Sequence, residues 1–287
     1  MVEDNFKGLV SVGMPTRNRA FCIRRALDSL LVQSYTNFEL IISDNASTDK
    51  TSEICQEYAQ QDKRIKYFRQ AINIGSFGKG GNFEFVLKRA RGQYFMWASD
   101  DDIWNKSFIE NCVRKLDENK EAVMAFTGVV GIDEEGEFLR YFFPKKFFPE
   151  EKDLYLRLKK YLLFYYYEGK ANLIFGLWIR EKILNNKLKN HWAADIGYIF
   201  INLIEGNFVL VNDFLFFKGL KKINPKRWGI LSKICREIDK RILTVVSLYF
   251  YCYFSTILGS KKINLKNKFK LIACILSTIP RLFFRRY

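Results

Sequence analysis

Short apolar runs alternate with helical patterns through the first 130 residues of this 287-residue chain. The apolar runs predict five strands, at residues 9–14, 38–43, 65–69, 94–98 and 122–130. Between the first two strands, helical spacing predicts a helix with one apolar face, formed by Ile23, Ala26, Leu27, Leu30 and Leu31. Strands and helices that alternate in this way favour an α/β fold with a mainly parallel central sheet and helices on both of its faces.

Polar residues directly follow three of the predicted strands. They are Pro15-Thr16, Asp44-Asn45 and Asp100-Asp101-Asp102. In a parallel sheet the carboxyl ends of the strands lie at one edge, and ligands bind beyond that edge. We therefore expect these three loops to converge on a single binding site.

The three consecutive aspartates at 100–102 carry the clearest chemical signal. Carboxylates in one turn repel one another, and a divalent cation relieves that repulsion. Hard oxygen ligands suit Mg²⁺ or Mn²⁺, which also bind substrate phosphates. The alternative is a solvated turn whose first aspartate caps a helix at 103–118.

Two other loops offer groups that suit a nucleotide. Asp44 can accept hydrogen bonds from a nucleobase N–H or a ribose hydroxyl, and the segment PTRN at 15–18 offers backbone N–H groups beside Arg17 and Arg19. The glycine-rich segment NIGSFGKGGN at 73–82 precedes a helix, where the backbone can approach an anion closely. Glycines before a helix are also common in plain turns, so the order of these segments along one sheet is the more specific signal.

In this order the segments resemble glycosyltransferase family 2, whose members have the GT-A nucleotide-sugar fold. The resemblance rests on VSVGMPTRNR (10–19), ELIISDNASTDKT (39–51), NIGSFGKGGN (73–82) and ARGQYFMWASDDDIW (90–104). It implies transfer of a sugar from a nucleoside diphosphate sugar, with uridine as the family's usual nucleoside, to a hydroxyl of a glycan or lipid-linked acceptor in cell-surface polysaccharide assembly. The donor-binding residues that it implies are Pro15, Thr16, Asn18, Asp44, Asn73, Gly75, Lys79, Asn82, Asp100 and Asp101. It implies Mn²⁺ or Mg²⁺ as the cofactor, held by Asp102 and Asp101.

Two positions depart from the family's pattern. Gly81 stands where the family usually has an arginine before the asparagine, and Lys79 is the candidate for its role. Ser99 stands where the family usually has the first aspartate of its Asp-x-Asp pair. The acidic set is therefore shifted, and the metal ligands are expected among residues 100–102.

The region 131–217 resembles the acceptor half of the family more loosely, through GLWIREKI (176–183) and HWAADIGYIFINLIEGNFVLVNDFLFFK (191–218). Asp195 matches the family's acidic position at a helix start and is the candidate catalytic base, which implies inversion at the anomeric carbon. Its alternative role is that of a helix N-cap. Weaker acceptor-binding candidates, each with a structural role as the alternative, are Trp178, Arg180, His191 and Trp192.

The net charge of +16 is concentrated at the C-terminal end. Residues 218–287 hold 17 Lys and Arg against two acidic residues, whereas residues 1–217 hold 30 basic and 29 acidic residues. The uncharged run 242–260 is barely long enough to span a bilayer. We therefore expect a basic, apolar helical tail that lies on an anionic membrane surface, with an ordinary helical subdomain as the alternative. The expected division is a GT-A domain at 1–217, with a donor-binding half to about residue 130 and an acceptor half after it, and a membrane-association region at 218–287.

Other features narrow the function further. Six cysteines without a C-x-x-C pair and a single histidine argue against a disulfide framework, a zinc module or a multi-histidine site. Because no apolar signal run opens the sequence, we expect the chain at the cytoplasmic face of the cell membrane. The rival functions are a metal-dependent nucleotidyl- or phosphotransferase on a similar sheet and a non-enzymatic, basic membrane- or nucleic-acid-binding protein. The neutral body and the three-aspartate loop argue against nucleic acid, because phosphate backbones avoid carboxylates.

Overall fold

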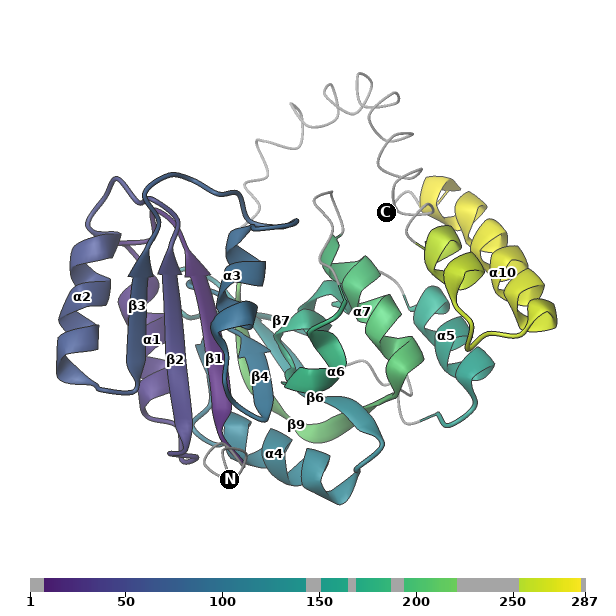
Figure 1. The fold of residues 1–287 in the computed structure, drawn as a ribbon, viewed down its shortest axis with the longest axis horizontal. Helices are drawn as coiled ribbons and strands as arrows, with labels where there is room; N and C mark the ends of the chain where they lie inside the picture. The colour runs from purple at the N-terminus through teal and green to yellow at the C-terminus, as the bar shows by residue number, and fades with distance from the viewer. Residues whose placement is uncertain (1–7, 143–150, 165–168, 187–193, 221–252, 285–287) are drawn as a thin grey trace.

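A computed structural model describes residues 8–142, 151–164, 169–186, 194–220 and 253–284 (Figure 1). The nine strands in this part of the chain form one sheet in the order β3-β2-β1-β4-β8-β6-β9-β5, with β7 paired to β6. The strands are β1 (Val10–Thr16), β2 (Phe38–Asp44), β3 (Ile65–Arg69), β4 (Tyr94–Trp97), β5 (Ile103–Trp104), β6 (Ala122–Ile132), β7 (Phe138–Phe142), β8 (Leu177–Ile179) and β9 (Asn207–Gly219). The helices are α1 (Ile23–Leu31), α2 (Thr51–Gln61), α3 (Asn82–Arg89), α4 (Phe108–Glu118), α5 (Leu154–Leu163), the 3-10 helix η3 (Lys170–Phe175), α6 (Arg180–Ile183), α7 (Ala194–Glu205) and α10 (Leu265–Phe284).

The first half of the sheet is parallel. Strands β3, β2, β1 and β4 lie side by side, and each pair is joined by parallel hydrogen bonding. The five strands predicted from apolar runs all form, and their ends lie within two residues of the predicted ones. The expected α/β fold is confirmed, and the carboxyl ends of β1, β2 and β4 meet at one edge of the sheet.

The second half of the sheet is mixed. Strand β8 lies between β4 and β6 and is antiparallel to both, whereas β6 and β9 are parallel to each other. The helix predicted at 103–118 begins only at Phe108, because Ile103 and Trp104 pair with Phe217 and Phe216 of β9. This short strand β5 ties the acidic turn that precedes it to the far half of the sheet.

Helices cover both faces of the sheet and define two apolar cores. On one face α1 and α2 pack against the parallel strands and α4 packs against β6 and β9, with the predicted α1 residues Ile23, Ala26, Leu27 and Leu30 all buried. On the other face lie α3, η3, α5 and α7. One close approach requires glycine: a Cβ at Gly13 of β1 would lie 2.7 Å from Val86 Cγ2 of α3.

Part of the region predicted as a membrane tail packs onto the globular body. Tyr253, Ile257, Leu271 and Ile275 are buried in the same core as Tyr161 of α5, and Figure 1 shows α10 beside α5. Strand β9 runs past the predicted boundary at 217/218 to Gly219. Most of the run 242–260 lies outside the described residues, and among the helices that are described none has both the length and the apolar character needed to cross a bilayer.

Two of the weaker acceptor-binding predictions are wrong. Trp178 in β8 is fully buried between Trp97 and Phe208, and its indole N–H donates to the Ile174 carbonyl at 3.0 Å. Arg180 follows β8, and its guanidinium donates to the carbonyl of Gly92, before the start of β4. Because β8 is antiparallel to β4, Arg180 lies at the edge opposite the carboxyl ends of β1, β2 and β4. The positions of both residues follow from the packing of the short strand β8 in the middle of the sheet.

A stability measurement tests this core assignment. Trp178→Ala removes a fully buried indole and should lower the free energy of unfolding by about 3–5 kcal/mol in chemical denaturation. Phe138→Ala, at a side chain that is 53% exposed on β7, is the matched control and should change it by under about 1 kcal/mol. A Trp178→Ala variant as stable as the unmodified chain would contradict the core assignment and leave acceptor binding as a possible role of Trp178.

Candidate functional site

The three polar loops meet at the edge of the sheet, as expected. The Asn45 N–H donates to the Thr16 carbonyl at 2.8 Å, which joins the loops after β2 and β1. The Arg19 guanidinium donates to Asp100 at 3.1 Å, which joins the loop after β1 to the acidic turn after β4. The parallel register of β1, β2 and β4 produces this convergence, because all three chains leave the sheet in the same direction.

Asp44 holds the loop after β2 in shape. Its carboxylate accepts hydrogen bonds from the Ser47 N–H at 2.9 Å, the Ser52 hydroxyl at 2.6 Å and the Tyr67 hydroxyl at 3.0 Å. The side chain has no exposed surface. The predicted contact between Asp44 and a nucleoside stays a prediction.

The loop after β1 depends on an unusual backbone position. Asn18 has φ +53°, in the left-handed region that asparagine tolerates better than most residues. Its side-chain oxygen accepts from the Thr48 N–H at 2.8 Å, and its own N–H donates to the Ser47 hydroxyl at 3.0 Å. Pro15 is half-buried and Thr16 is buried at the end of β1. These contacts fix the backbone N–H groups of the loop toward the neighbouring strand end.

The glycine-rich segment is held by two asparagines. Asn45 donates to the Asn73 side chain at 2.8 Å and accepts from the Ile74 N–H at 2.8 Å. Asn82 is buried, and it exchanges hydrogen bonds with the hydroxyl and the carbonyl of Ser43 at 2.6 and 2.8 Å. Asn82 and Asn45 are therefore frame residues of this edge, that is, residues whose side chains hold the loops in place.

Other predicted residues of the same segment are open to solvent. Asn73, Gly75 and Lys79 are exposed, and Gly75 has φ +76°, with room for a ligand where its Cβ would lie. Lys79 is accordingly accessible to an anion, and its role in place of the arginine missing at Gly81 stays a prediction.

The acidic turn distributes its three carboxylates over different partners. Asp100 is nearly buried against Arg19, and burial raises the pKa of its carboxyl while Arg19 opposes that shift. Asp102 is fully buried and accepts from the Lys218 ammonium and from the Gly219 N–H, both at 2.9 Å. Asp101 is the most exposed of the three, and its carboxylate accepts from the Ser99 hydroxyl at 2.5 Å.

Lys218 at the end of β9 is the functional residue that the sequence reasoning missed. Burial raises the pKa of Asp102 to about 6, with the Lys218 charge acting against this shift. Burial also lowers the pKa of Lys218, but the neighbouring aspartates, Asp102 first, hold it above its ordinary value. The two side chains therefore form a buried ion pair. The available signal was a single lysine that directly follows the apolar run FLFF at 214–217.

The end of β9 approaches the acidic turn closely. A Cβ at Gly219 would lie 2.6 Å from the Asp101 carbonyl oxygen, so only glycine fits without a shift of the backbone. This contact and the Asp102–Lys218 pair fasten the second half of the sheet to the turn after β4. The carboxylates consequently lie between two hollows of the surface, one on each side of the β9 end.

The first hollow, of about 530 Å³, lies beside the N-terminal end of α1. Its lining includes Arg19, Arg25, Asp101, Glu134 and Gly219. Arginines and carboxylates thus face the same space, and the exposed carboxylate of the acidic turn is among them. This hollow has the mixed charge expected where a cation and a diphosphate are held together.

The second hollow, of about 360 Å³, brings Asp195 and Lys218 together. Asp195 lies in the first turn of α7, where the helix dipole favours a negative charge, and its carboxylate accepts from the Ile196 N–H at 2.8 Å. Phe77 and Phe83, from the glycine-rich segment and α3, form an apolar wall. The predicted base therefore faces the same space as the lysine that pairs with the acidic turn. His191 and Trp192 lie outside the described residues.

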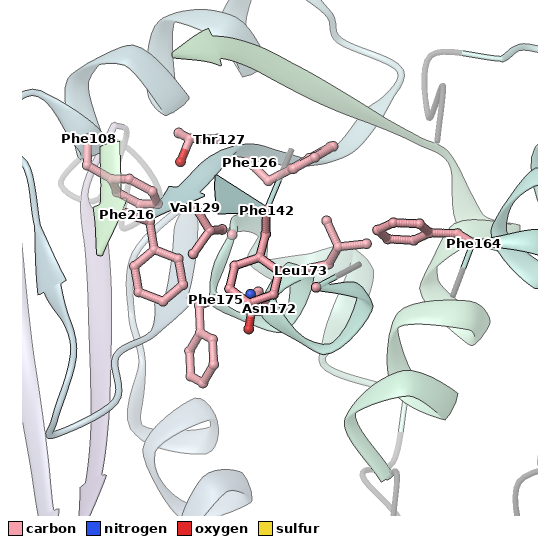
Figure 2. Close-up of a pocket in the computed structure, with 12 residues that line it drawn as sticks. Phe108, Phe126, Thr127, Val129, Phe142, Phe164, Asn172, Leu173, Phe175 and Phe216 are labelled. Carbon is pink, nitrogen blue, oxygen red and sulfur yellow. The ribbon is translucent and has the colours of Figure 1, made fainter. Parts of the chain in front are cut away.

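A much smaller void of about 10 Å³ lies deeper, and Figure 2 shows its lining. Phe108, Phe126, Phe164 and Phe216 surround it, with Thr127 and Asn172 as polar groups. It has room for about one water molecule. This void is therefore a packing feature of the core next to the second hollow, and it is too small for a substrate.

The residues of the acidic turn offer an incomplete set of metal ligands. In the described part of the chain, no group of three or more His, Cys, Asp or Glu side chains is arranged to hold a metal ion. Asp102, the other predicted ligand, is fully buried and pairs with Lys218, so a cation at Asp102 would lie close to the Lys218 ammonium. Asp101 can supply one carboxylate, and Mg²⁺ commonly takes one or two carboxylates and completes its shell with substrate phosphates and water. The turn thus fits a cation that arrives with a diphosphate, with Asp101 as its protein ligand.

Comparison with known proteins identifies the class of protein. The profile of glycosyl transferase family 2 matches residues 11–186, more than half of the chain, and the chain belongs to this family. An uncharacterized glycosyltransferase of Methanocaldococcus jannaschii is 28% identical over 239 residues, which cover 83% of this chain and 78% of that protein. The putative teichuronic acid biosynthesis glycosyltransferase TuaG of Bacillus subtilis is 35% identical over 124 residues, which cover 43% of this chain and 48% of TuaG. An uncharacterized glycosyltransferase of Rickettsia typhi is 34% identical over 155 residues, 53% of this chain and 46% of that protein. The matched part spans about half of the length of the last two relatives.

Solved structures share the fold. Residues 1–349 of S. aureus TarS in complex with UDP-GlcNAc superpose with a TM-score of 0.68 at 18% identity, covering 93% of this chain and 71% of that one. The mannosyltransferase PcManGT from Pyrobaculum calidifontis, in complex with GDP-Man and Mn²⁺, gives a TM-score of 0.54 at 15% identity, covering 97% of this chain and 76% of that one. The GT-A-like fold expected from the sequence is confirmed.

The buried pair gives a sharp prediction for stability. Lys218→Met leaves the Asp102 carboxylate buried without its cation, and it should lower the free energy of unfolding by about 3–5 kcal/mol. Adding Asp102→Asn to Lys218→Met removes that stranded charge, so the double variant should recover part of the loss in chemical denaturation. Additive losses in the double variant would show that the two side chains do not act as a pair.

Proposed function

We propose that the chain transfers a sugar from a nucleoside diphosphate sugar, with a UDP-sugar as the first candidate, to a hydroxyl of a glycan or lipid-linked acceptor. The reaction inverts the anomeric carbon and serves the assembly of a cell-surface polysaccharide. The observation that carries the proposal is the link between Asp102, Lys218 and Asp195. Through Lys218, the acidic turn at the strand ends adjoins the hollow in which the candidate base lies.

The loops at the sheet edge would hold the nucleotide. Backbone groups of Pro15–Asn18 and the exposed residues Asn73, Gly75 and Lys79 face the side of the edge beyond β1 and β2. The frame residues Asp44, Asn45 and Asn82 keep these loops in place through buried hydrogen bonds. Loops held in this way bind a ligand without a further cost of ordering their backbone.

The leaving diphosphate gains negative charge as the bond to the sugar breaks, and three groups of this chain can oppose that charge. Arg19 and Lys218 are fixed cations, held by Asp100 and Asp102 respectively. Asp101 would hold Mn²⁺ or Mg²⁺ against the phosphates. A bound cation of this kind neutralises the developing charge of the leaving group.

Asp195 would take the proton from the acceptor hydroxyl. Its place in the first turn of α7 favours a negative charge, and a general base requires that charge. In the proposed complex the acceptor occupies the hollow of Asp195 and attacks the sugar on the face opposite the departing diphosphate. Such an arrangement produces inversion.

The relatives support the donor class without fixing the nucleoside. One structural neighbour holds UDP-GlcNAc and another holds GDP-Man with Mn²⁺, and TuaG is named for teichuronic acid biosynthesis. A calorimetric binding screen of UDP-, GDP-, dTDP- and CMP-sugars, with and without Mn²⁺, tests the proposal for this chain. Binding of none of them would overturn it.

Substitution of the candidate base should separate binding from transfer. Asp195→Asn removes the proton acceptor and should lower turnover of the bound donor by about 100-fold or more, with donor affinity within about threefold of the unmodified chain. Release of the nucleoside diphosphate from the donor measures turnover. Glu205→Gln, at the other end of α7, is the control and should leave turnover unchanged. Near-normal turnover by Asp195→Asn would assign the base to another residue.

The cation contact has its own test. Asp101→Asn should weaken the Mn²⁺-dependent part of donor affinity by about tenfold, because one of the few protein ligands of the cation loses its charge. Glu134→Gln, a carboxylate elsewhere in the same hollow, is the matched control and should have little effect. Equal losses for both variants would indicate a general charge effect in place of a specific ligand.

A further inference from the structure

Helix α10 carries an apolar stripe that faces away from the protein body. Leu265, Phe269 and Leu276 are 69%, 66% and 51% exposed. They recur at i, i+4 and i+11 and therefore share one side of the helix. Leu258 before the helix is also exposed, and its carbonyl accepts from the Lys268 ammonium at 2.7 Å.

This stripe is distinct from the side of α10 that packs. Leu271 and Ile275 are buried in the core that includes Tyr161 of α5. At about 100° per residue, these two positions lie roughly a third of a turn away from the exposed stripe. The helix is thus fixed to the body by one apolar side and presents a second one outward.

Lysines surround the exposed stripe. Lys266 and Lys270 lie along one flank of it on the helix, Lys268 lies along the other, and Lys261 precedes the helix. The sequence holds no acidic residue after Asp239. We define the α10 face as the exposed side chains Leu258, Leu265, Phe269 and Leu276 with Lys261, Lys266, Lys268 and Lys270.

We propose that the α10 face binds the surface of an anionic lipid bilayer, with the helix lying in the plane of the interface. The apolar stripe would enter the boundary between headgroups and acyl chains, and the flanking lysines would meet lipid phosphates. This arrangement needs no spanning helix. It gives a structural form to the membrane contact expected from the sequence.

The positive charge of the α10 face favours an anionic bilayer over a second copy of the chain or another segment of it. A second copy would bring four lysines against four lysines of like charge. Residues 221–252 carry eight Lys and Arg against Glu237 and Asp239, so that segment also repels the α10 face. An anionic bilayer supplies both the apolar layer and the opposite charge that the face requires.

Vesicle flotation with the full chain tests the proposal. The chain should float with vesicles of phosphatidylcholine and phosphatidylglycerol, float far less with phosphatidylcholine alone, and lose binding as salt is raised. The variant Leu265→Ser/Phe269→Ser/Leu276→Ser should bind the anionic vesicles at least about tenfold more weakly. Its matched control is Val32→Ser/Phe138→Ser, at exposed apolar residues elsewhere, which should bind like the unmodified chain.

A second pair of variants tests the charge. Lys261→Gln/Lys266→Gln/Lys270→Gln should weaken anionic-vesicle binding by about tenfold or more, whereas Lys63→Gln/Lys66→Gln/Lys106→Gln should not. Circular dichroism confirms that each variant is folded, and donor binding is measured in parallel. Vesicle binding tests the α10 face and donor binding tests the proposed function. A variant that loses vesicle binding and keeps normal donor binding therefore reports on the α10 face alone.

Three outcomes would overturn the proposal. The serine variant could float like the unmodified chain, or the chain could bind neutral and anionic vesicles equally. The folded chain could also fail to float while the serine substitutions abolish a concentration-dependent dimer in sedimentation, which would assign the face to a second copy.

Discussion

The ion pair between Asp102 and Lys218 is the contact on which the candidate site depends. It joins the turn after β4 to the end of β9, across 116 residues of sequence, and brings the two halves of the sheet together at one edge. The Asp102 carboxylate is fully buried and the Lys218 side chain is 20% exposed, so the pair mainly offsets the cost of burying the carboxylate. Asp102 pairs with Lys218, and Asp100 pairs with Arg19. A ligand at the turn therefore meets two fixed cations and the carboxylate of Asp101, which is more exposed than the other two.

Residues at this edge divide into those that build the loops and those that face the hollows. Asp44, Asn45 and Asn82 are buried and spend their hydrogen bonds on neighbouring loop groups. Asp101, Asp195 and Lys218 line the hollows. A motif residue can therefore be essential to a site through the backbone that it fixes, without contact to the ligand.

The sequence predicted the first half of the fold well, because strand and helix periodicities are local properties and parallel topology then forces the loops to one edge. It could not predict the insertion of β8 between β4 and β6, since strand order depends on packing between distant segments. For that reason Trp178 and Arg180 were assigned to the acceptor site when they belong to the core and to the opposite edge. Lys218 was missed because its partner Asp102 is distant in sequence and because residue 218 was counted with the basic tail. The sequence showed that this region is basic and apolar, but the α10 face could be defined only once the buried side of the helix was known.

Hydrogen–deuterium exchange with and without UDP tests the central claim most directly, because it reports where a nucleoside diphosphate meets the backbone. The account predicts slower exchange in four segments that the sheet brings together: residues 16–20, 45–48, 73–79 and 99–102. Protection confined to other parts of the chain, with these four segments unchanged at saturating UDP, would contradict it.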